Sequence, residues 1–398
     1  MANPIENYTL CINCGSSSLK FSLYKAAKCT LELSGQVDRI GQENASLKIN
    51  DHTGRLLHSI TAHFPGFKAS ATELIDWLKT NGSRYAIQSI GHRVVQGGPE
   101  HREPKIITTE LLDNLQQYIY LAPNHLPDEL DTIKTFGSAY PEATQVACFD
   151  TAFHRDMPDL AKNYPLPAKY RENGLFKYGF HGLSYAFVMQ ELAEQHLQID
   201  EQKIIICHLG NGSSMAAIKK GISVDTTMGI SPIGGLVMGT RSGDLDPGVL
   251  LYLLKQYRMS PEELEDLLSK QSGLKAIAGS SDVQELLKVE SENKNAQTAL
   301  NVFCYSAKKY IGSLAAALQG LDMLIFTGGI GENAAAIRER ICLGLDFMGI
   351  DVDRQKNVKN ETIISKTTSR VTVRVIKTNE ELMLAIITND LLYSLNKQ

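Results

Sequence analysis

The sequence lacks a hydrophobic run of the roughly 18 residues that a membrane-spanning helix needs. Its opening residues, MANPIENYTL, also lack the basic and apolar regions of a secretion signal. Both absences argue against a secreted or membrane-embedded protein. We therefore expect a cytoplasmic protein.

An excess of basic residues is also absent, because the net charge is −4. Nucleic-acid and membrane-surface binding usually need such an excess, so neither kind of partner is predicted. The seven cysteines are odd in number and scattered, which predicts reduced thiols. Cys11 and Cys14 have the spacing of a metal or redox pair, but no second pair completes a zinc site.

What is present is an ordinary globular composition over 398 residues, enough for roughly two to three domains. The sequence contains no linker or low-complexity tract, so a boundary must be a compact crossover. The best position lies just after Asp150. We expect one domain over residues 1–150, completed by the closing helix 380–398, and a second domain over 151–379.

Residues 204–221 read as a hairpin with a turn of small residues. Two apolar strands, 204–207 and 215–218, flank a turn that contains His208, Gly210, Asn211, Gly212 and Ser213. Such a turn exposes backbone N–H groups, and its glycines let an anion approach closely. It is a candidate phosphate-binding loop, although turns of this kind are often only structural.

The same pattern occurs near the N-terminus, where Asn13 and the run Gly15-Ser16-Ser17-Ser18 separate two strands and Lys20 follows. Two such loops indicate an internal duplication. Two similar domains that face a central cleft would present both loops to one ligand.

Two arginines lie among glycines. We expect Arg93 to lie in a short loop that follows the strand 86–91 and includes Gly97 and Gly98. Arg241 lies in the irregular segment 230–248. An arginine in either setting can bind a carboxylate or phosphate through two N–H groups, but a surface arginine in a flexible loop remains the alternative.

Asp150 directly follows the apolar strand 144–149, which fits a metal-binding or base role, with a helix N-cap as the alternative. His181 follows Gly179 and Phe180 and precedes a predicted helix over 183–197. It could donate to an anion, or it could be structural.

The strand 323–327, the glycine-rich loop 328–333 and the helix 334–345 form an arrangement typical of phosphate or nucleoside binding in α/β folds. The loop is neither a P-loop nor a G-x-G-x-x-G motif. Further helices are predicted over 66–79, 109–120, 127–136, 292–318 and 379–395. Ser260, Pro261 and Glu263 predict a capping box at the start of another helix.

Taken together, these segments resemble the acetate kinase family of the superfamily that also contains sugar kinases, heat-shock chaperones and actin. The resemblance runs from about Thr9 to Leu392. In family order it includes the motifs NCGSSSLK, GHRVVQGG, VACFDTAFH, YGFHG, HLGNGSS, GLVMGTRSGDLDP, FTGGIGEN and TNEELM.

The resemblance implies an α/β fold of two duplicated RNase H-like, actin-like ATPase domains, with nucleotide binding and homodimerisation in the second. It implies reversible transfer of the γ-phosphoryl group of ATP to acetate, with Mg2+ or Mn2+, giving acetyl phosphate and ADP. Another short-chain carboxylate is possible as the acceptor. A propionate kinase, or a nucleotide-binding protein of the superfamily that transfers nothing, remains an alternative.

The resemblance also implies roles for individual residues, each by its place in a motif. The catalytic residues would be Arg93, Asp150, His181 and Arg241. The metal-associated residues would be Asn13 and Glu380. The nucleotide-contacting residues would be Lys20, His208, Gly210, Asn211, Gly212, Asp282, Gly329, Gly331, Glu332 and Asn333.

This chain departs from the family pattern at several positions. Gln96 replaces a histidine, and Asn124 replaces an apolar residue near the expected acyl pocket. Leu183 and Tyr185 replace a threonine and a histidine. Gln284 stands where arginine is usual, in a segment one residue shorter, which weakens the assignment of Asp282.

Overall fold

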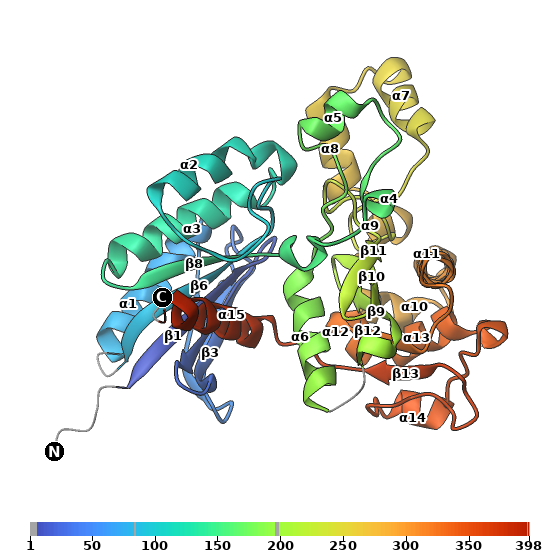
Figure 1. Cartoon of the computed structure of the whole chain (residues 1–398). Coiled ribbons are helices and arrows are strands. Elements are labelled where there is room, and N and C mark those ends of the chain that lie inside the picture. Colours follow the sequence, from blue (N-terminus) through green and yellow to red (C-terminus); the bar gives the residue numbers. More distant parts are fainter. Residues whose placement is uncertain (1–5, 83–84, 196–198, 396, 398) are drawn as a thin grey trace. The chain divides into compact units, whose positions relative to one another are not determined.

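The computed structural model describes residues 6–82, 85–195, 199–395 and 397. The chain forms two compact units, shown in Figure 1. Unit 1 contains the described residues up to Ala152 and those from Asn379 onward, and unit 2 spans Phe153–Thr378. Among the described residues, no helix has both the length and the apolar character to cross a bilayer.

Unit 1 is built on a mixed sheet whose central strands, β1, β6 and β8, are parallel. The strands on the β2 side of β1 and the short β7 next to β8 pair in antiparallel fashion. In spatial order the strands are β5 (Leu56–Ala62), β4 (Ala45–Asp51), β3 (Thr30–Asp38), β2 (Leu19–Lys25), β1 (Asn7–Cys14), β6 (Ala86–Val94), β8 (Thr144–Phe149) and β7 (Lys105–Ile106).

Unit 2 repeats the central part of this arrangement. Its sheet runs β11 (Ile222–Thr226), β10 (Ser213–Lys219), β9 (Lys203–Leu209), β12 (Met323–Thr327) and β13 (Thr372–Val375). β11, β10 and β9 are antiparallel, and β9, β12 and β13 are parallel. β3-β2-β1-β6-β8 has the same order and directions, so the predicted duplication of an RNase H-like fold is confirmed.

Helices cover both faces of the unit 1 sheet (Figure 1). The side chains of β1 alternate between the two faces: Leu10 and Ile12 pack in a core with α1 (Phe67–Asn81) and with Phe136 of α3 (Leu126–Ala139). On the other face, the Thr9 hydroxyl donates to Asn389 of α15 (Glu380–Leu395) at 2.7 Å. The closing helix therefore completes unit 1. Unit 1 also contains α2 (Thr109–Gln117) and the 3-10 turn Ile119–Leu121.

The sheet of unit 2 is likewise buried on both faces. Ile205 and Cys207 of β9 face a core built on α11 (Lys294–Leu318) and α13 (Ala335–Cys342), while Ile204 and Ile206 face α6 (Gly182–Glu194). A strand buried on both faces reads as a continuous apolar run, as residues 204–207 do. The other helices are α4 (Asp159–Lys162), α5 (Ala168–Glu172), α7 (Pro247–Gln256), α8 (Pro261–Lys270), α9 (Gly273–Ala278), α10 (Val283–Val289), α12 (Gly328–Asn333) and α14 (Arg354–Val358). The 3-10 turns are Ala152–His154, Ile199–Glu201 and Asp346–Met348.

Most predicted elements are present, with a few differences. The capping box at Ser260 and Glu263 forms as predicted, with both reciprocal hydrogen bonds. The prediction that Arg93 lies in a loop is wrong, because β6 pairs with β8 up to Val94 and includes it. The glycine-rich loop 328–333 is a short helix. β7 and β11 were not predicted. Residues 196–197, the end of the predicted helix 183–197, lie outside the described residues.

Candidate active site

In unit 1, polar side chains gather where the three parallel strands end. Asn13 is near the end of β1, Arg93 near the end of β6, and Asp150 directly follows β8. The carboxyl ends of neighbouring parallel strands lie at one sheet edge, which is where open α/β sheets bind ligands. The topology thus places three residues from distant parts of the sequence at one edge.

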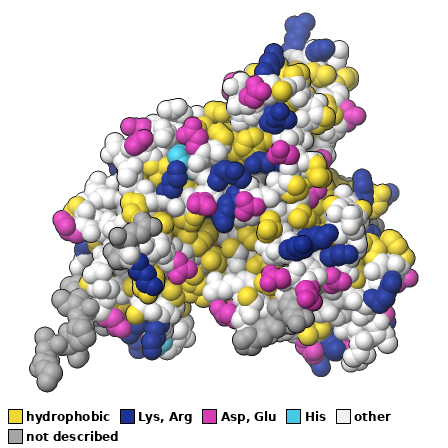
Figure 2. Space-filling model, in the orientation of Figure 1, with side chains coloured by type: hydrophobic (Ala, Val, Ile, Leu, Met, Phe, Trp, Pro, Cys, Tyr) yellow, Lys and Arg dark blue, Asp and Glu magenta, His cyan; other side chains and the backbone are white. Residues whose placement is uncertain are grey.

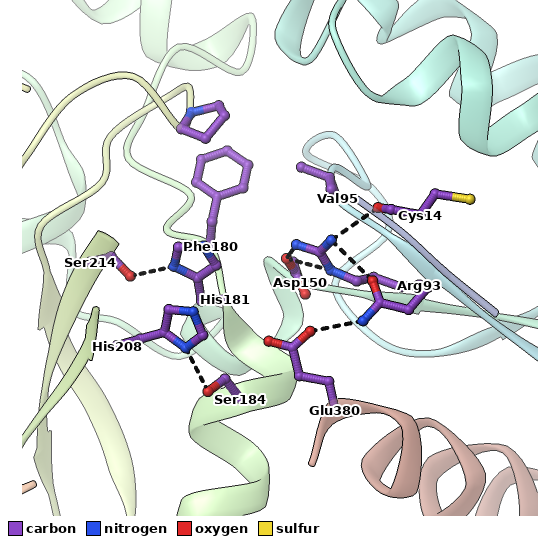
Figure 3. Close-up of polar contacts among 12 residues, drawn as sticks. Cys14, Arg93, Val95, Asp150, Phe180, His181, Ser184, His208, Ser214 and Glu380 are labelled. Atoms are coloured by element: carbon purple, nitrogen blue, oxygen red, sulfur yellow. Dashed lines mark hydrogen bonds and ion pairs between the residues drawn. The ribbon is translucent and has the colours of Figure 1, made fainter. Parts of the chain in front are cut away.

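Arg93 and Asp150 form a buried ion pair (Figure 3). Nη2 and Nε of Arg93 donate to Oδ2 of Asp150 at 2.6 and 3.1 Å. Their side chains are 12% and 1% exposed. Burial alone would lower the pKa of Arg93, but the carboxylates of Asp150 and Glu380 outweigh it and raise that pKa. The guanidinium is therefore a permanent cation at this edge.

Asn13 connects this ion pair to the start of α15. Its Nδ2 donates to Oε2 of Glu380 and to Oε1 of Glu381, both at 3.0 Å. Its Oδ1 accepts from Nη1 of Arg93 at 3.3 Å, and the same nitrogen donates to the carbonyl of Cys14 at 3.2 Å. Both glutamates lie in the first turn of α15, where the helix dipole favours negative charge. Glu381 was not predicted.

These side chains offer oxygen ligands of the kind that Mg2+ prefers. Two carboxylates, Asp150 and Glu380, and the amide of Asn13 belong to one hydrogen-bonded cluster. Mg2+ is usually held by one or two protein carboxylates together with water and substrate phosphates. Within the described part of the chain, no group of three His, Cys, Asp or Glu side chains could hold a metal ion. The donor chemistry of the cluster fits the predicted metal. Lys20 lies opposite Asn13 on β2 and is exposed.

A buried carboxyl group that sequence reasoning missed lies next to Arg93. Glu129 of α3 is 2% exposed, and its Oε2 accepts from the backbone N–H of Val95 at 3.0 Å. Its Oε1 is also buried and has no hydrogen-bond partner among the residues that the structure describes. Burial raises the pKa of Glu129 to about 8, against the opposing effect of Arg93. Glu129 therefore carries a proton over much of the neutral range.

In unit 2, His181 and His208 form a stacked pair (Figure 3). Their ring centroids are 4.3 Å apart and their planes differ by 22°. Nδ1 of His181 shares a 2.8 Å hydrogen bond with the Ser214 hydroxyl, and Nδ1 of His208 shares one of 2.8 Å with the Ser184 hydroxyl. The two serines orient the rings, and neither was predicted.

His181 is held in an unusual backbone conformation. It precedes α6 with a φ of 59°, in the left-handed region that non-glycine residues seldom adopt. His154 supports the preceding residue, because its Nε2 donates to the Phe180 carbonyl at 3.2 Å. Nδ1 of His154 shares a 2.8 Å hydrogen bond with Ser223, and burial lowers the pKa of His154 to about 4. His154 is therefore a neutral support and was missed by sequence reasoning.

The β9–β10 turn brings Arg241 and His181 together. Gly212 lies at this turn, and a Cβ atom there would be 3.3 Å from both Nη1 of Arg241 and Nε2 of His181. Nη1 of Arg241 donates to the Pro232 carbonyl at 3.2 Å. A cation and an imidazole thus approach the same glycine, which only a residue without a side chain allows easily.

The second glycine-rich segment lies beside this turn. β9 and β12 are parallel neighbours with His208 opposite Thr327, so Gly210 and Gly328 follow the ends of adjacent strands. A Cβ atom at Gly328 would lie 2.8 Å from the Leu209 carbonyl, and its φ is +76°. This position therefore requires glycine.

Two predicted nucleotide residues use their carboxylates locally. Oε1 of Glu332 accepts from the backbone N–H groups of Gly328 and Thr378, both at 3.0 Å. Oδ1 of Asp282 accepts from the N–H groups of Gln284 and Glu285 at 2.7 and 3.2 Å, which makes it the N-cap of α10. A nucleotide contact by either carboxylate would have to replace or share these bonds.

Known proteins resemble this chain in both sequence and fold. Residues 8–386 match the model of the Acetokinase family. The acetate kinase of Shouchella clausii is 44% identical over 385 residues, which cover 94% of this chain and 97% of that protein. The crystal structure of Porphyromonas gingivalis acetate kinase is 36% identical with a TM-score of 0.86, covering 97% and 100% of the two chains. The crystal structure of a propionate kinase from Francisella tularensis is 36% identical in sequence and has a TM-score of 0.89. The match covers 96% of this chain and 99% of that chain.

The family match spans both groups of polar residues, the Arg93–Asp150 group of unit 1 and the histidine–glycine group of unit 2. The matched relatives are themselves similar to this chain over almost its whole length. By sequence and by fold, this chain belongs to the acetokinase family of kinases that act on a carboxylate acceptor.

Proposed function

We propose that this protein transfers the γ-phosphoryl group of ATP to acetate, reversibly, giving acetyl phosphate and ADP. The observation that carries the proposal is the buried Arg93–Asp150 pair, joined through Asn13 to Glu380 at the edge of the unit 1 sheet. It combines a permanent cation for a carboxylate with oxygen ligands for a divalent metal. Family membership supports the same reaction.

The acceptor needs no general base. Acetate is ionised at neutral pH, so its oxygen attacks the γ-phosphorus directly while the bond from that phosphorus to the bridging oxygen of ADP breaks. No proton moves in this step. Asp150 already accepts two hydrogen bonds from Arg93 through Oδ2, and we assign it to the metal and not to proton transfer.

The residues of the site act by positioning and by charge. Arg93 would bind the acceptor carboxylate, and Arg241 and His181 would stabilise the negative charge on the equatorial oxygens of the transferred group. Asp150, Glu380 and Asn13 would hold Mg2+ or Mn2+. When bound, that ion neutralises charge on the phosphates.

The nucleotide would be contacted by Lys20 in unit 1 and by the loops of unit 2. Gly210, Asn211 and Gly212 form the turn that follows His208, and the segment with Gly329, Gly331 and Asn333 begins at the end of the neighbouring strand β12. The Gly210 N–H already donates to the Gly212 carbonyl at 3.1 Å, so a phosphate would have to replace or share that bond. Because the Glu332 carboxylate binds two backbone N–H groups, we expect this residue to meet the nucleotide through its main chain. Asp282 would act through the loop that precedes α10.

We also propose a homodimer formed by unit 2. α7 has no buried residue, and Val249, Leu251 and Tyr252 are 42%, 52% and 57% exposed on it. Hydrophobic side chains are visible at this end of unit 2 in Figure 2. Apolar surface of this kind is typical of a protein interface.

The test is acyl phosphate formation with Mg-ATP and formate, acetate, propionate or butyrate, trapped as the hydroxamate. A maximum at acetate is expected. A maximum at propionate would make propionate the preferred acceptor and leave the proposed mechanism unchanged. The absence of hydroxamate with every acid would contradict phosphoryl transfer. Asn124→Leu, which restores the apolar residue of the family pattern, is the matched variant for acyl preference. It separates an effect of Asn124 from one of the rest of the pocket.

A further inference from the structure

Arg338 of α13, in unit 2, is a fully buried arginine, 0% exposed. Its Nε donates to Oδ1 of Asn357 at 2.8 Å, and its Nη2 donates to the carbonyl of Asn357 at 2.8 Å and to Oδ1 of Asn360 at 2.5 Å. Its Nη1 donates to the carbonyls of Gly331 and Glu332 at 2.7 and 2.9 Å. All five donors of the guanidinium are thus used.

None of these acceptors is a carboxylate. Arginine is seldom fully buried without an anionic partner, because removing a charge from water is costly. Burial lowers the pKa of Arg338 to about 10, so it still carries its charge at neutral pH. An apolar side chain would fill this space without the cost of removing a charge from water. We therefore attribute the presence of an arginine here to its five hydrogen bonds.

Two of the five bonds go to consecutive carbonyls at the end of α12. The last carbonyls of a helix have no partner within the helix and need one from elsewhere. The remaining bonds go to the end of α14, where Nδ2 of Asn357 also donates to the Ala335 carbonyl at 2.9 Å. Arg338 therefore ties the segment Gly328–Asn333 to the end of the neighbouring helix α14.

Gly329 of this segment is exposed. Among the described residues outside its own helix, no atom lies within 4 Å of the position that a Cβ would take at Gly329, whereas Gly331 is buried and its nearest contact would be a backbone carbon of Phe326 at 3.4 Å. Glu332 anchors the first residue, since its carboxylate accepts from the N–H of Gly328. The segment is thus held at its start by Glu332 and at the carbonyls of Gly331 and Glu332 by Arg338, while Gly329 faces space that a ligand could occupy.

We propose that Arg338 is a positioning residue that holds the backbone of Gly329–Asn333 in the conformation that binds the nucleotide, and so sets nucleotide affinity. The inference rests on the proposed function, because that function assigns the nucleotide to this segment. It adds a residue that touches neither the nucleotide nor the acceptor. Its effect should appear in nucleotide binding and leave acceptor binding unchanged.

The test compares Arg338→Met with Arg374→Met. Arg374 of β13 is also buried, at 6% exposed, and its Nη2 donates to Gln195 at 2.5 Å, so it controls for the general loss of a buried arginine. Titration calorimetry measures the Kd of Mg-ADP, and kinetics give KM for ATP and for acetate. Arg338→Met should raise the nucleotide Kd and KM at least about tenfold, because small displacements of a binding group have large effects. The KM for acetate should stay within about twofold, and Arg374→Met should change neither beyond about twofold.

A milder variant covers the case in which Arg338→Met does not fold. Asn360 has a φ of 53°, so Asn360→Gly suits the backbone while it removes one acceptor of Arg338. We expect it to weaken Mg-ADP binding about two- to fivefold, in keeping with the loss of one hydrogen bond. The Kd of Mg-ADP for Arg338→Lys should lie between those of Arg338→Met and the unmodified protein. Lysine keeps the positive charge but loses the planar set of five N–H donors.

An unchanged nucleotide Kd in the Arg338 variant or in Asn360→Gly, with a fall in Tm like that of Arg374→Met, would show that Arg338 is merely structural and would overturn the inference. A protein that binds Mg-ADP but forms no acyl phosphate would overturn the proposed function alone, and the calorimetric comparison would still decide the role of Arg338. A protein that binds no nucleotide would overturn both.

Discussion

Replacing Glu129 by glutamine should change the pH dependence of stability in unit 1. Glu129 is buried beside Arg93, and burial raises its pKa from 4.5 to about 8. The folded state therefore holds the proton more tightly than the unfolded state. Between these two pH values the stability of the protein must fall as the pH rises, because the folded state has to release a proton that it binds well.

The size of this effect follows from the two pKa values. The interval from 4.5 to about 8, at roughly 1.4 kcal/mol per pKa unit, corresponds to on the order of 5 kcal/mol between the pH limits. Glutamine keeps an acceptor for the Val95 N–H and removes the ionisation. Its NH2 group takes the place of Oε1, for which the described part of the chain provides no hydrogen-bond partner, at a cost of about 1–3 kcal/mol.

Glu129→Gln should therefore be less stable than the unmodified protein at pH 5 and more stable at pH 9. The single tryptophan, Trp77, lies in α1 of unit 1, so urea unfolding followed by its fluorescence reports on this unit. Asp131→Asn is the matched control, because Asp131 lies on the same helix and is exposed. A difference in unfolding free energy that stays constant from pH 5 to pH 9 would refute the reasoning.

Three further outcomes are expected from the site. Arg93→Ala should lower acyl phosphate formation by about 10²–10³ while calorimetry shows unchanged Mg-ADP binding, and normal transfer would contradict the role of Arg93. Removing divalent ions with a chelator should abolish transfer, and added Mg2+ or Mn2+ should restore it. Glu380→Gln should raise the Mg2+ concentration needed for half-maximal rate. An unchanged Mg2+ requirement would contradict the assignment of Glu380 to the metal site. Ser214→Ala, which leaves Nδ1 of His181 without its hydroxyl partner, should lower kcat about tenfold with little change in the KM for ATP, as expected for a group that orients a catalytic side chain.

Local patterns predict most of the fold because apolar runs and turn residues are adjacent in the sequence. The strand 144–149 and the strand 323–327 have the predicted bounds. Strand ends are harder to predict, since pairing extends them. Arg93 was placed in a loop, but β8 provides backbone partners up to Val94. The residue keeps its position at the sheet edge and gains the rigidity of a strand.

The side chains that support the site could not be predicted in the same way, because their partners are distant in the sequence. Glu129 binds the N–H of Val95, and Ser214 binds His181, each more than thirty positions away. Arg338 looks like an ordinary helix residue in the sequence. Only the tertiary structure shows that its guanidinium donates to two carbonyls of the 328–333 segment.

Asp150 and Asp282 use their carboxylates in different ways. Asp150 could have been a helix N-cap, but its Oδ2 instead accepts two hydrogen bonds from Arg93. Asp282 was assigned to the nucleotide, and its carboxylate is the N-cap of α10. The difference is that Asp150 follows a buried parallel strand, whereas Asp282 precedes a helix with free backbone N–H groups.

The duplicated sheets use the same edge for different chemistry. In unit 1, the ends of β1, β6 and β8 carry Asn13, Arg93 and Asp150, which suit a carboxylate and a divalent cation. In unit 2, the corresponding ends of β9 and β12 carry His208, the turn at Gly210 and the segment that begins at Gly328, which suit phosphate groups. Phosphoryl transfer between two anions needs both kinds of site, because the acceptor and the donor phosphates repel each other and must be held by separate positive groups. Under the proposed function, duplication followed by divergence at one sheet edge would provide both within a single chain.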